Sequence, residues 1–189
     1  TEVAYMGCRT RVMANVVDEN KAVTPGRGNL SFTSINLPRI AYLSTTKDDF
    51  YKRLNRMMDI AARSLRIKRG VITKLLDEGL YPYTKRYLGS FDSHFSTIGL
   101  VGMNEVGLNA NWLRADMTNP KTQEFSKEVL NHMRNRLSDY QEQYGDLYNL
   151  EATPAESTSY RLAKHDIKKW PNIKTAAKVG ETPFYTNSS

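Results

Sequence analysis

The chain has 189 residues, of which 40% are hydrophobic and 25% charged, and its formal net charge is +7. This composition is typical of a globular domain, and the absence of a long apolar run excludes a membrane partner. One cysteine excludes an internal disulfide, no zinc-ligand spacing is present, and a free thiol predicts a cytoplasmic protein. The positive charge predicts attraction for phosphates. Without a basic stripe interleaved with aromatics, a nucleotide fits better than polymeric nucleic acid.

The N-terminal part predicts two extended segments separated by turns. Residues 2–6 are typical of a short buried strand, and Gly7 permits an unusual backbone turn before the next residue, Cys8. Residues 24–29 are dense in turn-forming residues, with glycines that allow a close approach of backbone or ligand. Residues 30–41 carry a proline, and we expect an irregular extended segment that passes into a short helix.

The next stretch predicts an amphipathic helix. Thr46 and Asp49 form an N-cap with an acidic first turn. The apolar residues that follow recur at helical spacing and predict one buried stripe: Phe50, Leu54, Met57, Ala61 and Leu65. We expect Gly70 to end this helix and a second helix to cover residues 71–78, followed by a turn over residues 79–83.

The second half predicts strands that alternate with helices. Residues 96–102 and 147–152 are short apolar runs, typical of buried strands in a parallel sheet. We expect a helix after each, over residues 103–113 and 156–169. Asn119-Pro120 opens a long amphipathic helix between them. The order of strands and helices predicts an α/β fold with parallel strands.

The only cysteine is the first candidate for chemistry. A lone cysteine is most often a small buried hydrophobe, but a Gly-Cys-Arg tip after a strand would project the Cys8 sulfur into a cavity. Thiolate chemistry would pair it with a histidine. His94, His132 and His165 have no spacing that demands such a pairing, so a Cys–His hydrolase stays an unsupported alternative.

The turn at residues 153–159 is the second candidate. The start of a helix presents free N–H groups and the positive end of the helix dipole, both of which favour a phosphate. Ser157, Thr158 and Ser159 add hydroxyl donors at the same place. Thr153-Pro154 is also a good plain helix start, and that alternative stays open. Asn29 follows the glycine-rich turn, where it is either a polar site residue or a turn residue that tolerates a left-handed conformation.

Several ordered motifs together indicate a family. They are Met-Gly-Cys-Arg-Thr (6–10), Gly-Arg-Gly-Asn (26–29), Ser-Ile-Asn-Leu-Pro-Arg-Ile (34–40), Ser-Thr-Ile-Gly-Leu-Val-Gly-Met-Asn-Glu (96–105) and Glu-Ala-Thr-Pro-Ala-Glu-Ser-Thr-Ser-Tyr-Arg-Leu-Ala-Lys (151–164). The chain resembles anaerobic (class III) ribonucleoside-triphosphate reductases over essentially its whole length.

The resemblance implies a fold. The family's catalytic subunit has a ten-stranded α/β barrel of two antiparallel five-stranded halves, with a finger loop passing through it. Residues 1–189 would be a single segment of about half that barrel, internal to a longer chain. Residues 1–45 would hold the finger loop and the segment after it. Residues 146–170 would hold a strand, the phosphate-binding turn and a helix.

The resemblance also implies residue roles. Cys8 would become a thiyl radical and abstract the 3′-hydrogen of the substrate ribose. Asn29 would lie near the ribose and the reductant, and Met6 would line the same cavity. The phosphates would be held by residues of the turn: Glu156, Ser157, Thr158 and Ser159. Residues 96–105 would form a barrel strand and its exit, with a packing role.

The implied reaction is the anaerobic reduction of ribonucleoside triphosphates to 2′-deoxyribonucleoside triphosphates. The implied partners are a radical S-adenosylmethionine iron–sulfur activating enzyme, ATP or dNTP effectors and a second copy in a homodimer. The implied reductant is formate, with a thiol system left open. No cofactor or metal is expected within this segment itself.

Some motifs of the family are missing. The family places its glycyl radical in a C-terminal motif that Gly180, in Lys-Val-Gly-Glu-Thr-Pro, does not match. The four-cysteine structural zinc site, the N-terminal nucleotide-sensing cone and a second active-site cysteine have no counterpart. We therefore expect the segment to be inactive by itself. The alternatives are another glycyl-radical enzyme, or a non-catalytic nucleotide-binding or split-chain module.

Overall fold

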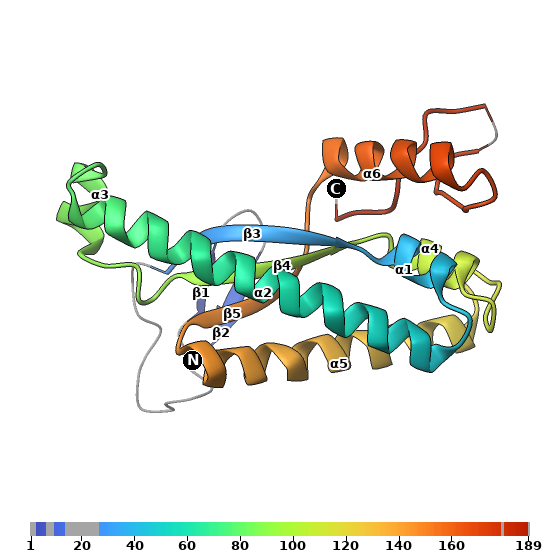
Figure 1. Ribbon diagram of the computed structural model, residues 1–189, viewed down its shortest axis with the longest axis horizontal. Coiled ribbons are helices and arrows are strands. Elements are labelled where there is room, and N and C mark those ends of the chain that lie inside the picture. The colour runs from blue at the N-terminus through green and yellow to red at the C-terminus, as the bar shows by residue number, and fades with distance from the viewer. Residues whose placement is uncertain (1–2, 7–9, 14–26, 179, 189) are drawn as a thin grey trace.

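The computed structural model describes residues 3–6, 10–13, 27–178 and 180–188. Its centre is a parallel sheet of three strands in the order β3-β4-β5 (Figure 1). These strands are β3 (Asn29–Asn36), β4 (Phe95–Val101) and β5 (Leu147–Ala152). A separate antiparallel pair joins β1 (Val3–Met6) to β2 (Thr10–Met13), with Met6 opposite Thr10. The predicted α/β class with parallel strands is confirmed.

Two long helices run beside the sheet (Figure 1). They are α2 (Lys47–Asp77) and α5 (Pro120–Tyr144), and the core lies between them and one face of the strands. Ile35 of β3 and Ile98 and Leu100 of β4 belong to this core. Successive side chains of a strand point to opposite faces, so Ser34, Thr97 and Gly99 lie on the face away from these helices.

Three shorter helices follow strand ends. They are α1 (Leu37–Leu43), α4 (Met103–Asn109) and α6 (Glu156–Lys169). Figure 1 shows α6 above the ends of β3 and β4, on a separate level from α2 and α5. Among the described residues, no helix combines the length and the apolar character needed to cross a membrane.

The prediction that Gly70 ends a helix is wrong. Helix α2, which is 31 residues long, continues through Gly70 to Asp77, and Gly70 has open space around it. A glycine in a helix interior costs only about 1 kcal/mol, which the long buried stripe of α2 offsets. The observed buried stripe differs from the predicted one at one position, because Met58 is buried and the predicted Met57 is exposed.

Two other boundaries differ from prediction. Pro82 and Tyr83, expected at the end of the turn over residues 79–83, instead begin helix α3 (Pro82–Leu88), which has no buried residue. Helix α4 ends at Asn109 rather than near residue 113, because the chain turns at Ala110 into an extended conformation. The strong local signals hold: Asn119 caps α5, and Thr46 caps α2 by accepting a hydrogen bond from Asp49 N at 3.1 Å.

The buried carboxylate of Asp166 links helix α6 to the rest of the fold. Asp166 accepts hydrogen bonds from Asn36 Nδ2 at 2.7 Å, Arg39 Nε at 2.6 Å and the Tyr185 hydroxyl at 2.8 Å. The next residue along from Tyr185, Thr186, donates its N–H and its hydroxyl to buried Glu105 of α4, at 2.8 and 2.7 Å. The C-terminal segment therefore joins α6 to α4.

Candidate active site

A cavity of about 580 Å³ lies between the start of β3 and the end of β5. Asn29 lines it, and its Nδ2 lies 3.5 Å from Oε2 of Glu151 on β5. The other lining residues are Leu30, Ser31, Phe32, Thr153 and Pro154. The fold therefore brings predicted Asn29 to the turn after β5, although 122 residues separate Asn29 from Glu151.

The register of the sheet places Asn29 and Glu151 on the same face. Asn29 pairs with Phe95 of β4, and Glu151 pairs with Gly99. Phe95 and Gly99 are four residues apart in β4 and therefore face the same side of the sheet. Their partners Asn29 and Glu151 face that side as well. A register shift between Asn29 and Ser31 precedes the regular pairing of β3.

The turn after β5 packs closely against the middle strand, β4, at Gly99. A Cβ on Gly99 would lie 1.9 Å from the Thr153 hydroxyl oxygen, so only glycine admits the turn here. The hydroxyls of Ser34 and Thr153 lie 3.2 Å apart and form a hydrogen bond. Because the Thr153 hydroxyl contacts β3 in this way, it does not cap helix α6, and the plain helix-start alternative loses its N-cap.

Helix α6 instead begins without a side-chain cap. Its N-cap is Ala155, whose methyl group offers no acceptor to the first-turn N–H groups. Ser157 is exposed and Thr158 half-buried beside them. Ser159 is buried, donates its hydroxyl to Glu156 O at 3.0 Å and accepts from Asn187 Nδ2 at 3.4 Å. The arrangement offers N–H donors and two hydroxyls to an anion, with Ser159 beneath them.

One buried hydroxyl of β3, on the face of the strand that carries Ile35, has no partner within the described part of the fold. The Ser31 Oγ is shielded from solvent and has no hydrogen-bond partner among the described residues. An orphaned hydroxyl costs free energy unless a ligand or water satisfies it. Sequence reasoning missed Ser31, because an isolated serine in a strand carries no signal.

Two more residues were predicted to line the cavity, Cys8 and Met6. Cys8 lies outside the described residues. Met6 ends β1, where its backbone pairs with Thr10. The placement of the sulfur relative to Asn29 therefore stays a prediction.

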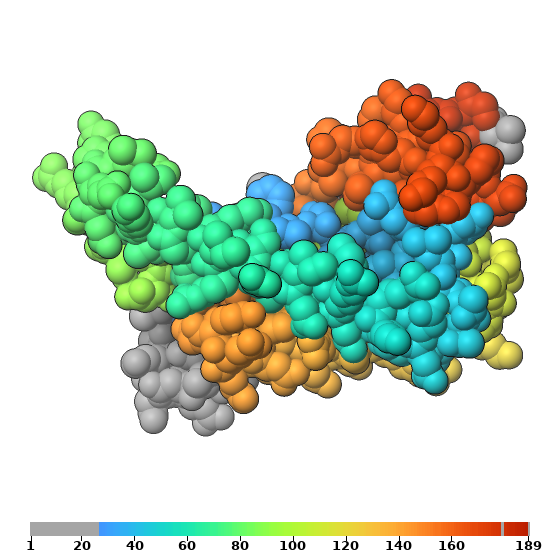
Figure 2. Space-filling view, viewed as in Figure 1, coloured from blue at the N-terminus to red at the C-terminus, as the bar shows by residue number. Residues whose placement is uncertain are grey.

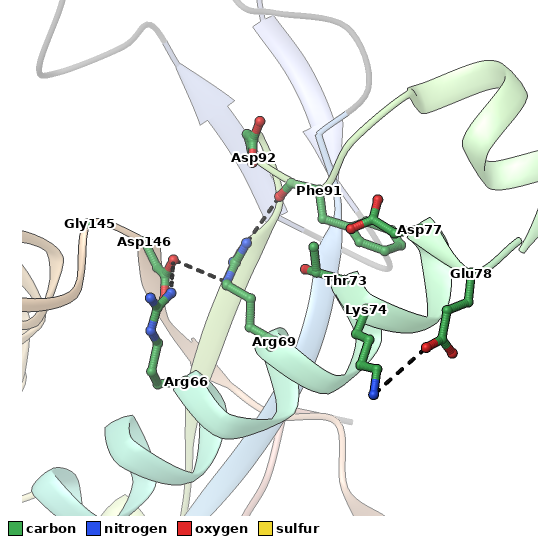
Figure 3. Close-up of a pocket in the computed structure, with 11 residues that line it drawn as sticks. Arg66, Arg69, Thr73, Lys74, Asp77, Glu78, Phe91, Asp92, Gly145 and Asp146 are labelled. Carbon is green, nitrogen blue, oxygen red and sulfur yellow. Dashed lines mark hydrogen bonds and ion pairs between the residues drawn. The ribbon is translucent and has the colours of Figure 1, made fainter. Parts of the chain in front are cut away.

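A larger cavity of about 710 Å³ lies between α2 and the segments that lead into β4 and β5 (Figure 3). Its charged groups serve the fold. Arg66 Nη1 contacts both carboxylate oxygens of Asp146 at 2.9 Å, and buried Arg69 donates to the carbonyls of Phe91 and His94 at 3.0 and 2.5 Å. Because these cations are already paired, this cavity is a weaker candidate than the one at Asn29.

Two of the histidines are enclosed by the fold, because His94 is buried and His132 is half-buried. Burial, followed by the nearby Arg69 charge, lowers the pKa of His94, and its Nδ1 has no partner among the described residues. His132 Nε2 lies 2.6 Å from Asn55 Oδ1, and burial lowers its pKa. Neither lines the cavity at Asn29. Within the described ranges, no group of three or more metal-ligating side chains could hold a metal ion.

The family model for anaerobic ribonucleoside-triphosphate reductase matches residues 1–189. The chain belongs to this family. Among curated relatives, the anaerobic ribonucleoside-triphosphate reductase of Enterobacteria phage T4 is 26% identical over 98% of this chain and 32% of its own length. The Haemophilus influenzae reductase is 28% identical over 98% of this chain and 28% of its own length. The chain thus spans about a third of the length of these reductases.

Solved reductase structures share the fold. The Thermotoga maritima anaerobic ribonucleotide reductase with citrate in its active site gives a TM-score of 0.68 at 22% identity, covering 83% of this chain and 32% of that one. The same enzyme in complex with dATP and CTP gives 0.67 at 22% identity, covering 81% and 28%. The predicted fold class, part of the α/β barrel of this reductase family, is confirmed.

Proposed function

We propose that this chain is the part of an anaerobic reductase catalytic subunit that binds and activates the ribonucleotide. The reaction is the radical reduction of ribonucleoside triphosphates to 2′-deoxyribonucleoside triphosphates. The observation that carries the proposal is the single cavity shared by Asn29 and the turn after β5. Family membership gives that cavity its substrate class.

The phosphates bind at the start of α6. Uncapped N–H groups and the helix dipole attract the anion, and the hydroxyls of Ser157 and Thr158 donate to it. Glu156 contributes its backbone N–H, and buried Ser159 supports the turn from below. The net charge of +7 favours the approach of a triphosphate.

The ribose then lies toward Asn29. The Asn29 amide, oriented by Glu151, donates to a ribose hydroxyl. Met6 and Cys8 complete the cavity from the segment around β1. A thiyl radical on Cys8 takes the 3′-hydrogen with one electron, which leaves an S–H bond on Cys8 and an unpaired electron on C3′.

The rest of the enzyme lies outside these 189 residues. A glycyl radical, made by a radical S-adenosylmethionine activase, supplies the oxidising equivalent for Cys8, and formate supplies the reducing equivalents. Effector sites for ATP and dNTP, a structural zinc site and a homodimer interface complete the protein, which works in the cytoplasm. Residues 1–45 and 146–170 are the two parts of this chain that contact substrate.

The experiment uses the full-length reductase that contains this chain. Cys8→Ser abolishes formation of deoxynucleotide, while electron paramagnetic resonance still detects the glycyl radical after activation. In the unaltered enzyme, a 3′-deuterated substrate slows product formation. Retained turnover in the Cys8→Ser enzyme would refute the role of Cys8.

A further inference from the structure

Helix α2 carries a second apolar stripe that the fold leaves uncovered. Four large apolar residues of α2 are exposed: Met57 by 43%, Ile60 by 53%, Ile67 by 60% and Val71 by 54%. Together with Ser64 they form what we call the α2 seam, and α2 runs across the face shown in Figure 2 with no other segment over it. A row of exposed large apolar side chains on one helix is typical of an interaction surface.

The spacing of the seam points to a helical occupant. Its positions, 57, 60, 64, 67 and 71, alternate steps of three and four residues. This alternation gives a straight row along one side of a helix, and it is the pattern by which one helix packs along another. The row is about 21 Å long at 1.5 Å per residue, which matches about four turns of a facing helix.

The middle of the seam is hollow. Ile60, Ser64 and Ile67 line a shallow cavity of about 340 Å³ together with Arg63 and Lys68. The small Ser64 side chain between two isoleucines creates the depression. A large apolar side chain of a facing helix fits such a hole.

The charges beside the seam specify the occupant's chemistry. Arg56, Arg63 and Lys68 are exposed, and no ion pair joins them to another described residue. Two of the four acids of α2 are engaged elsewhere, because Asp49 pairs with Arg53 and Asp59 with Arg136, and the other two, Asp48 and Asp77, lie at its ends. A helix with acidic residues beside its apolar row would pair with these cations.

A second copy of this chain is a poor occupant. Two α2 seams face to face would bring Arg56, Arg63 and Lys68 of one copy against the same cations of the other. Like charges across an interface oppose association, and the chain already has a net charge of +7. The relatives have about two-thirds of their length outside the matched segment, so a reductase polypeptide has a long further stretch of chain that could supply the occupant.

We propose that the α2 seam is the docking site for an acidic amphipathic helix from the part of the same polypeptide that lies outside residues 1–189. The inference rests on the proposal that the chain is a segment of a longer reductase. It does not depend on how the cavity at Asn29 works. Tethering in one polypeptide gives the helix a high effective concentration at the seam.

The test measures thiol labelling in the full-length reductase. Ile67→Cys places a reporter in the seam, and Lys127→Cys, exposed on α5, is the matched control. We expect the Ile67→Cys thiol to react with a maleimide at least about tenfold more slowly than the control thiol, since it becomes accessible only when the helix detaches. Equal labelling rates would overturn the proposal, whether or not the enzyme is active.

Two further arms identify the occupant. Adding Arg63→Glu and Lys68→Glu to the Ile67→Cys protein should raise its labelling rate toward the control. A carbodiimide, which joins lysines directly to carboxylates, should link Lys68 to an acidic residue outside residues 1–189 of the same polypeptide. Protection that survives charge reversal would overturn the acidic chemistry. Protection that weakens on dilution, with cross-links between copies, would overturn the intramolecular source.

Discussion

Asn29 at the start of β3 and Glu151 at the end of β5 face each other across the middle strand, with Nδ2 and Oε2 3.5 Å apart. The two residues connect the glycine-rich turn to the phosphate turn. In the proposed site, Glu151 therefore sets the direction in which the Asn29 amide points. Neither residue is deeply buried, so the pair matters through orientation more than through stability.

This relationship predicts graded effects at Glu151. Glu151→Gln keeps an oxygen that can accept from Asn29 Nδ2, whereas Glu151→Ala removes it. In the full-length enzyme we expect Glu151→Ala to lower kcat by about tenfold, a loss of roughly 1.4 kcal/mol, and Glu151→Gln to lower it less. Glu142→Ala, an exposed change on α5, is the control. Equal rates for the alanine and glutamine variants would exclude an orienting role.

The packing of Thr153 on Gly99 predicts opposite effects for two glycines. Gly99→Ala places a methyl group where the Thr153 hydroxyl lies, and should lower the free energy of unfolding by about 1–3 kcal/mol. Gly70→Ala adds a methyl group in open space within α2, and should raise it by about 0.5–1 kcal/mol. Denaturant unfolding measures both. Thr153→Ala in the Gly99→Ala protein should recover part of the loss, and a fully additive pair would contradict the contact.

Asp166 should be among the most sensitive carboxylates in the fold. It is fully buried and accepts from Asn36, Arg39 and Tyr185. Asp166→Ala leaves three donors without their acceptor, and we expect it to lower the free energy of unfolding by about 3 kcal/mol. Asp139→Asn, at an exposed position of α5, should change it by less than about 0.5 kcal/mol. A small effect at Asp166 would mean that α6 is held by other contacts.

The buried His94 predicts a pH dependence of stability. Burial, then the Arg69 charge, lowers its pKa in the folded protein below the ordinary 6.5. The unfolded chain therefore takes up a proton near pH 6.5 while the folded chain does not. The free energy of unfolding should fall as the pH drops from about 7 through the folded pKa, by at most about 1.4 kcal/mol per pH unit for this group.

Unfolding midpoints measured between pH 5 and 8 check this dependence. His94→Gln should flatten the slope on the acidic side, whereas Gln143→Asn, an exposed change on α5 that removes no titrating group, should leave it unchanged. His132, whose pKa burial also lowers, contributes in the same direction and should account for part of the remaining slope. A slope that His94→Gln does not alter would contradict the assignment.

Local signals predicted most of the elements and some of their boundaries. Thr46 and Asn119 cap the helices that they were expected to start, because N-capping acts within one turn. The break at Gly70 was wrong because burial along the whole of α2 outweighs one unfavourable residue. The burial of three charged residues could not be predicted, because their hydrogen-bond partners lie far away in the sequence. These residues are Asp166, Glu105 and Arg69.

In the candidate site, too, local signals were predictable from the sequence and long-range contacts were not. The sequence identified Asn29 and the turn after β5 separately, from turn chemistry and from the start of a helix. Their meeting depends on the register of β3, β4 and β5, which no local pattern specifies. Glu151 begins the motif at residues 151–164, but no role was predicted for it, and only the cavity and its contact with Asn29 show that it belongs to the site.

The most direct test of the central claim uses Ser157 at the start of α6. Ser157→Asp adds a negative charge that the helix dipole favours, so stability should hold or rise, yet the same charge repels a triphosphate. In the full-length reductase, we expect the dissociation constant for a ribonucleoside triphosphate to rise at least about tenfold, with no fall in the melting temperature. Ser138→Asp, exposed on α5, should change neither value. Unchanged triphosphate affinity in the Ser157→Asp protein would contradict the proposed site.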